Sequence, residues 1–183
     1  MLSKVSGALL LMAGSFFSST AVATLTQNDK VASLINQRLS YMKDVSGYKA
    51  NNHLAIEDIH QEIRVLSSSV LKAEKLRLDG ESVKPFLQAQ MDAAKAIQYR
   101  YRADWLSVQE GGWQPASLEQ VRSKISLLNT KILTDISTQL SKGELFTDKT
   151  NFIKQLSQTH LKDSDKECLW YSLKKITLKK QAL

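Results

Sequence analysis

Apolar residues recur along most of this chain at intervals of three and four, which is the spacing of an amphipathic helix. The first such segment ends near Asn51, and its apolar face carries Val31, Leu34, Ile35, Met42 and Val45. The same period predicts further helices at about 57–78, 82–105, 117–142, 148–161 and 164–178. The pattern therefore predicts an all-α fold, a single helical bundle of about six helices, three of them long.

Turn and capping residues set the expected boundaries of these helices. Asp79 and Gly80 are expected to end the second helix, and Ser82 is expected to cap the start of the third. The clearest loop is the EGGWQP segment at 110–115. Ser117 begins a capping box at the start of the fourth helix. These signals divide the chain into helices without indicating a second domain.

The N-terminal residues have the pattern of a secretory signal peptide. Lys4 supplies the positive charge, residues 5–17 form an apolar run of thirteen, and Ala21-Val22-Ala23 is a small-residue cleavage site. We therefore expect a signal peptide at 1–23, a helical domain at 24–183, and a periplasmic or secreted protein. An uncleaved membrane anchor is the alternative, although thirteen residues are too few to span a bilayer as a helix.

Composition excludes several classes of function. The chain has 183 residues, which suits one domain, and only seven Gly and two Pro, which suits long helices. The net charge is +7, but the basic residues are spread along the chain, so we expect no nucleic-acid partner and no membrane contact after signal cleavage. A single cysteine, Cys168, allows no intrachain disulfide, and three scattered histidines give no metal-ligand spacing.

Two cations interrupt the apolar face of the first segment. Arg38 and Lys49 are eleven residues apart, which is close to three helical turns, so both project from that face. An unpaired buried charge is costly, so an anion should meet them. Asp58 and Glu62 on the next helix either are that partner or share a ligand with it. The plainer interpretation is that each cation extends to the surface or forms an ordinary ion pair.

These residues carry a family resemblance, together with others in the first two thirds of the chain. The matching positions are Arg38, Lys49, 54–58 (LAIED), Glu62, 65–66, 93–101 (AAKAIQYRY) and 104–105. Over about residues 30–140 the chain resembles the all-helical chorismate mutases, in particular their secreted or periplasmic (gamma) subclass. The resemblance implies a cofactor-free isomerase that converts chorismate to prephenate, as in aromatic amino acid biosynthesis. Relatives of this subclass are dimeric, so a homodimer is possible.

The resemblance also implies roles for four catalytic residues. Arg38 matches the Arg of the first helix that binds a substrate carboxylate, and Arg122 is the best match for a second such Arg. Lys49 matches the Lys that bonds the ether oxygen, and Gln98 falls where the family has Gln or Glu facing that oxygen. No metal is implied.

The remaining site positions surround the substrate. Asp58 and Glu62 match positions near the substrate hydroxyl, and Val65 and Ala94 match the pocket wall. Gln61 departs from the family, which has an Arg there; Arg64 stands one turn later. This departure leaves open two alternatives with the same fold, an isochorismate pyruvate-lyase and an inactive chorismate-binding relative. An alternative of another class is a secreted helical interaction protein, which would have an exposed apolar face and no pocket.

Overall fold

The structure is a computed structural model that describes residues 27–108 and 110–180, with side chains described from residue 30 onward. The predicted signal peptide at 1–23 lies outside the described residues. Seven helices follow in order: α1 (Gln27–Ser40), α2 (Met42–Asn51), α3 (Ile59–Lys75), α4 (Gly80–Ser107), α5 (Leu118–Ser141), α6 (Lys149–Gln155) and α7 (Asp163–Leu173). Within the described residues the only extended pairing is an isolated bridge between Leu78 and Leu178. The predicted all-α fold is confirmed, with α3, α4 and α5 as the three long helices.

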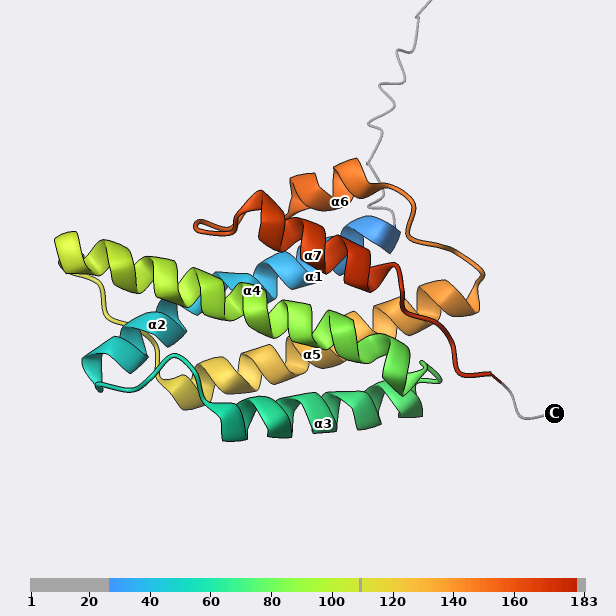
Figure 1. Ribbon diagram of the computed structural model, residues 1–183, viewed down its shortest axis with the longest axis horizontal. Coiled ribbons are helices and arrows are strands. Elements are labelled where there is room, and N and C mark those ends of the chain that lie inside the picture. The colour runs from blue at the N-terminus through green and yellow to red at the C-terminus, as the bar shows by residue number, and fades with distance from the viewer. Residues whose placement is uncertain (1–26, 109, 181–183) are drawn as a thin grey trace, which may run out of the picture.

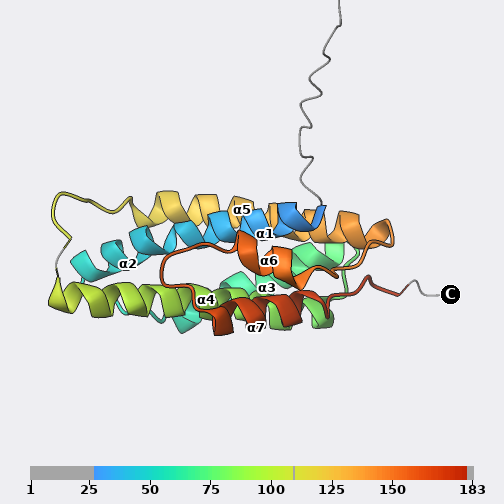
Figure 2. The same ribbon diagram turned by 90° about the horizontal axis from the view of Figure 1, so that it is seen from above.

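The helices pack in two layers around one core. Figure 2 shows α1, α2 and α5 on one side, and α4 with α7 beside it on the other. In Figure 1, α3 runs along the edge of the bundle, next to α4 and α5. The apolar face predicted for the first segment lies in the core, since Val31 and Ile35 are fully buried and Met42 is 2% exposed. The periodicity therefore identified the inner face correctly.

The first predicted helix is interrupted at Tyr41, which separates α1 from α2. The interruption is small, because the Val45 N–H still donates to the Tyr41 carbonyl at 3.0 Å and α2 continues beyond α1 (Figure 1). Counting α1 and α2 as one bent helix gives the six that the sequence predicts. The bend leaves Arg38 and Lys49 on the wall of the same cavity.

The predicted boundary between the second and third helices is wrong. The helix α3 ends at Lys75, and Arg77 makes the turn with a left-handed φ of 65°. Asp79 then caps the start of α4 by accepting a hydrogen bond from the Glu81 N–H (3.2 Å). Ser82, predicted as that cap, instead donates its hydroxyl to the Asp79 carbonyl. An Asp-Gly pair serves equally as a stop or a start, so the local sequence did not decide between them.

Close packing explains the glycine at the start of α4. A Cβ on Gly80 would lie 2.7 Å from a carboxylate oxygen of Glu74 and 3.1 Å from Cγ1 of Val70, both on α3. The glycine therefore allows α3 and α4 to meet closely at the end of the bundle away from α2. Among the described residues, no helix is long and apolar enough to cross a membrane.

Candidate active site

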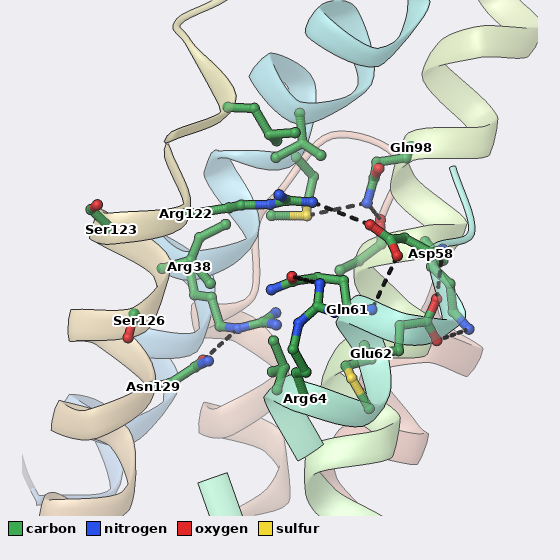
Figure 3. Close-up of a pocket in the computed structure, with 18 of the residues that line it drawn as sticks. Arg38, Asp58, Gln61, Glu62, Arg64, Gln98, Arg122, Ser123, Ser126 and Asn129 are labelled. Carbon is green, nitrogen blue, oxygen red and sulfur yellow. Dashed lines mark hydrogen bonds and ion pairs between the residues drawn. The ribbon is translucent and has the colours of Figure 1, made fainter. Parts of the chain in front are cut away.

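A cavity of about 880 Å³ opens between α1–α2, α3, α4 and α5 (Figure 3). All nine site residues expected from the sequence line it, although they come from five helices and one connection: Arg38, Lys49, Asp58, Gln61, Glu62, Val65, Ala94, Gln98 and Arg122. A protein that served only as an interaction surface would not need such a cavity. The roles that the resemblance implies remain predictions, but the residues are together.

Arg38 is the most deeply buried cation of this cavity, with 5% of its surface exposed. Its Nε donates to the side-chain oxygen of Asn129 on α5 at 2.8 Å, and a terminal nitrogen donates to the Gln90 carbonyl at 3.2 Å. No carboxylate among the described residues pairs with it. Burial lowers the pKa of the guanidinium to about 10, so it stays charged at neutral pH. A buried cation without a counter-ion favours an anionic ligand.

Lys49 on α2 has a similar environment. It is 7% exposed, and its ammonium donates to the Ile56 carbonyl at 2.6 Å. Burial is the main cause that lowers the pKa of Lys49, and the nearby positive charge of Arg122 lowers it further, against opposing effects of Asp58 and Glu62. Of the two alternatives that the sequence left open, a direct ion pair with Asp58 or Glu62 is not formed in the described structure. An anionic ligand would therefore stabilise the charged form of Lys49.

Asp58 joins the cavity to the start of α3. It caps that helix by accepting a hydrogen bond from the Gln61 N–H at 3.0 Å, so α3 begins at Ile59, two residues later than expected. Its other oxygen pairs with Arg122 of α5 at 3.4 Å, and Figure 3 shows Arg122 reaching across the cavity. The Gln61 N–H is the main cause that lowers the pKa of Asp58, assisted by Arg122. The carboxylate is therefore ionised and holds Arg122 over the cavity.

Glu62 pairs with a residue to which the sequence analysis gave no role. The ammonium of Lys95 lies 2.9 Å from the Glu62 carboxylate and 3.3 Å from that of Asp92. The signal was present, because Lys95 directly follows Ala94 and precedes Gln98 by three residues on α4. Asn129, the partner of Arg38, was likewise given no role. Contacts between helices far apart in sequence placed both side chains.

Gln98 presents an amide to the cavity from α4 and is 5% exposed. Its nitrogen donates to the Ala94 carbonyl at 3.1 Å and approaches the Met42 sulfur at 3.6 Å. Its oxygen is buried without a hydrogen-bond partner. A buried polar atom left unpaired is costly, and such atoms are common at functional sites.

Gln61 is hydrogen-bonded to the arginine one turn later on α3. A terminal nitrogen of Arg64 donates to the Gln61 side-chain oxygen at 2.7 Å, and both residues line the cavity (Figure 3). The position where the family has an Arg is thus occupied by an amide that contacts an arginine.

The lining of the cavity carries a surplus of positive charge. Six lining side chains are cationic (Arg38, Lys49, Arg64, Lys72, Lys95 and Arg122) and three are anionic (Asp58, Glu62 and Glu119). Two of the three carboxylates already pair with Arg122 and Lys95. The cavity therefore suits a small molecule with more than one negative charge. In the part of the chain that the structure describes, no group of three or more His, Cys, Asp or Glu residues has the arrangement of a metal site.

The chain is similar to proteins of one family. Residues 26–99 match the model of chorismate mutase type II. A secreted chorismate mutase of Yersinia pestis is 51% identical over 172 residues, which are 93% of this chain and 92% of that protein. A monofunctional chorismate mutase of Enterobacter agglomerans is 42% identical over 147 residues, covering 80% of this chain and 81% of that protein.

Solved structures give the same result. The crystal structure of the secreted chorismate mutase from Yersinia pestis has a TM-score of 0.80 and covers 82% of this chain and 98% of that one. A chorismate mutase from Burkholderia thailandensis, 19% identical, has a TM-score of 0.67 over 81% of this chain and 97% of that one, which shows the shared fold. On the identity and coverage of these relatives, the chain belongs to the all-helical chorismate mutase family.

Proposed function

We propose that this chain converts chorismate to prephenate in the cavity of Figure 3, without a covalent intermediate or a cofactor. The observation that carries the proposal is that Arg38 and Lys49 are buried on the cavity wall with no carboxylate partner in the described structure. Chorismate is a dianion, and the surplus of cations in the lining suits its charge. In the reaction a C–O bond breaks and a C–C bond forms within one molecule. An enzyme need only hold the reactive conformer and stabilise the charge that develops.

Arg38 and Arg122 are the proposed carboxylate-binding residues. They come from α1 and α5, and both lie along the cavity in Figure 3. A guanidinium binds a carboxylate through two parallel hydrogen bonds, which fixes its orientation as well as its position. Two such contacts would hold the substrate at both carboxylates. Asn129 supports this geometry, because its bond to the Nε of Arg38 fixes one edge of the guanidinium.

Lys49 and Gln98 are the proposed partners of the ether oxygen, which gains negative charge as its bond breaks. An ammonium acts as a compact charge on a single oxygen, and the burial of Lys49 keeps water from screening it. The Gln98 amide can add a second donor from α4. Its unpaired oxygen supports this role, because rotation of the amide on ligand binding would exchange the present contacts for better ones.

The other lining residues would shape the pocket around the ring. Asp58 and Glu62 are proposed to lie near the substrate hydroxyl, where carboxylates accept its hydrogen bond. Their pairing with Arg122 and Lys95 supports this role, because it keeps two negative charges from repelling a dianion. Val65 and Ala94 supply the apolar wall.

Gln61 decides between this function and its closest alternatives. Without the family's Arg at this position, the loss of a charged hydrogen bond to a substrate oxygen would cost about 1.5–3 kcal/mol. A loss of that size is compatible with a weakened enzyme, an isochorismate pyruvate-lyase or a binding-only protein. The contact with Arg64 favours a working mutase, since it brings a guanidinium to the same part of the cavity.

The test is to incubate the purified chain, without residues 1–23, separately with chorismate and with isochorismate and to separate the products by chromatography. We expect prephenate from chorismate, with no more pyruvate from isochorismate than in the buffer control. The matched protein control is the Lys49→Ala variant, which should be folded but slow. Pyruvate from isochorismate without prephenate from chorismate would establish the lyase alternative. Binding of chorismate without any product would establish an inactive relative.

We also propose that the protein is exported and cleaved after Ala23, leaving Thr24 as its first residue. The charge at Lys4, the short apolar run and the Ala21-Val22-Ala23 site support this, and the related Yersinia pestis protein is named as secreted. Mass spectrometry of protein recovered from the periplasm or medium measures the mature N-terminus. A chain that still began at Met1 would contradict cleavage.

A further inference from the structure

Exposed basic residues gather at the end of the bundle where α3 meets α4. No membrane contact was expected from the sequence, because its cations are spread along the chain. The fold brings two distant groups of them together: Lys75 and Arg77 at the end of α3, and Lys175, Lys179 and Lys180 in the segment after α7. Figures 1 and 2 show that segment at the same end of the molecule as the α3–α4 turn. We call these five exposed residues the basic end.

Backbone pairing fixes the two groups side by side. The Lys179 N–H donates to the Arg77 carbonyl at 2.8 Å, and Leu78 and Leu178 form the isolated antiparallel bridge. Leu78 is fully buried, Ile176 is 4% exposed, and Leu178 packs against the core. The core therefore anchors both segments through their apolar residues, and their cations remain on the outer surface.

The charge of the basic end is not neutralised by ion pairs. None of its five cations forms one within the described residues. Residues 174–180 contain four lysines and no acidic residue. The acidic residues nearby in sequence are Glu74, Asp79 and Glu81, of which Asp79 caps α4 and Glu81 pairs with Lys84. A concentrated, unpaired positive charge favours an anionic partner.

A bilayer fits this surface better than a nucleic acid does. A helix that reads duplex DNA presents its side chains to a groove, whereas four of the five cations lie outside helices. Proteins bind single strands by stacking bases on aromatic rings, but Tyr171, the exposed ring one turn before Lys175, already has the Lys149 ammonium over it at 4.8 Å.

The connection between α5 and α6 begins at the same end of the bundle (Figure 1). It adds an exposed cation, Lys142, and an apolar side chain, Leu145, which is 68% exposed. Cations beside an exposed apolar side chain suit the boundary between lipid headgroups and acyl chains. The two features together favour contact with lipid.

We propose that the basic end docks the mature chain on an anionic phospholipid bilayer, as a reversible contact with the headgroups. Each Lys or Arg near such a surface strengthens binding about fivefold, and the attraction is screened by salt. None of the five residues lines the active-site cavity. The proposal is therefore independent of the proposed reaction, and it replaces the expectation of no membrane contact.

Co-sedimentation with vesicles tests the proposal, using the chain without residues 1–23 because its apolar run would itself bind lipid. We expect binding to vesicles of equal parts phosphatidylglycerol and phosphatidylcholine, weakened by high salt, and little binding to phosphatidylcholine alone. Lys175→Gln with Lys179→Gln should bind about 25-fold more weakly, since two cations are lost at about fivefold each. The matched control is Lys154→Gln with Lys162→Gln, which removes the same charge from exposed lysines elsewhere and should bind within about threefold of wild type, the scale of a surface contact.

Circular dichroism establishes that each variant is folded. Lys75→Gln with Lys180→Gln removes the same charge from the basic end and carries the test should the first pair fail to fold. No binding to the anionic vesicles would overturn the proposal, and so would equal binding to the neutral ones. Equal losses in the basic-end and control variants would also overturn it, because net charge alone would then explain the binding. A short DNA duplex is the third probe, and binding to it without binding to vesicles would make nucleic acid the partner instead.

Discussion

Replacing Lys49 by methionine is the sharpest test of the proposed mechanism. Methionine has a similar length and no charge, so the change removes the ammonium and little of the packing. If that ammonium meets the ether oxygen, its contribution grows as the bond breaks. We therefore expect kcat to fall much more than KM rises.

The size of the loss follows from the surroundings of Lys49. The residue is 7% exposed, so the ammonium acts where water screens it little. Removing one donor to a developing oxyanion in such a site costs about 2.7–4 kcal/mol, which is ~10²–10³ in kcat. Stability should change little, because two effects oppose each other. The fold no longer buries an ammonium, but the Ile56 carbonyl loses its donor, at a cost of about 1–3 kcal/mol.

The assay is steady-state turnover of chorismate by wild type, Lys49→Met and Lys49→Ala, with thermal melts followed by circular dichroism. Lys72→Met is the matched control, because Lys72 lines the same cavity but is exposed and bonds the Thr130 hydroxyl instead. Its kcat should stay within about threefold of wild type, the scale of a surface contact. A folded Lys49→Met variant with wild-type kcat would refute the reasoning and leave Lys49 a structural residue.

Three further measurements test the other parts of the site. Gln61→Arg should leave kcat/KM equal or raise it, because it adds a cation for a dianionic substrate; a tenfold loss would show that the Gln61–Arg64 pair is itself needed. Asn129→Ala frees the Nε of Arg38 and should raise KM by ~10-fold or more, the loss of about 1.5 kcal/mol from a charged hydrogen bond, whereas an unchanged KM would remove Asn129 from the site. The pKa of Lys49 is lowered by burial, so kcat/KM should fall as pH rises through a value below the ordinary 10.5, and the fall in kcat should come at higher pH because bound substrate restores the charged form. A pH–rate profile of both parameters checks this order, and coincident limbs would contradict it.

Local sequence signals determined the helices and their inner faces. A period of 3.6 residues marks which side of a helix is buried, which is why Val31, Ile35 and Met42 lie in the core as predicted. The same period put Arg38 and Lys49 on one side, and the bend at Tyr41 did not change that. The cap at Ser117 was also predicted, and it is confirmed because the Ser117 hydroxyl oxygen accepts a hydrogen bond from the Gln120 N–H within the same turn. Each of these features depends on residues within a few positions of one another.

The family resemblance supplied the set of site residues, which periodicity alone would not have separated from ordinary surface charges. It placed Gln98 and Arg122 in the site although they lie 49 and 73 residues beyond Lys49. It did not supply their contacts.

Only the tertiary structure decided which side chains pair. The sequence left open whether Asp58 and Glu62 pair with the cations of the first segment or share a ligand with them. In the structure these carboxylates pair with Arg122 and Lys95, and Arg38 and Lys49 have no carboxylate partner among the described residues. Helical periodicity gives the direction of a side chain from its own axis but not which neighbouring helix it meets.

The close contact between Gly47 of α2 and Trp113 of the α4–α5 loop has the same origin, since packing alone brings these two residues together. The start of α4 at Gly80 likewise depended on how closely α3 approaches it. Both features arise from distances between elements, which are set when the helices pack and have no signature within any one of them.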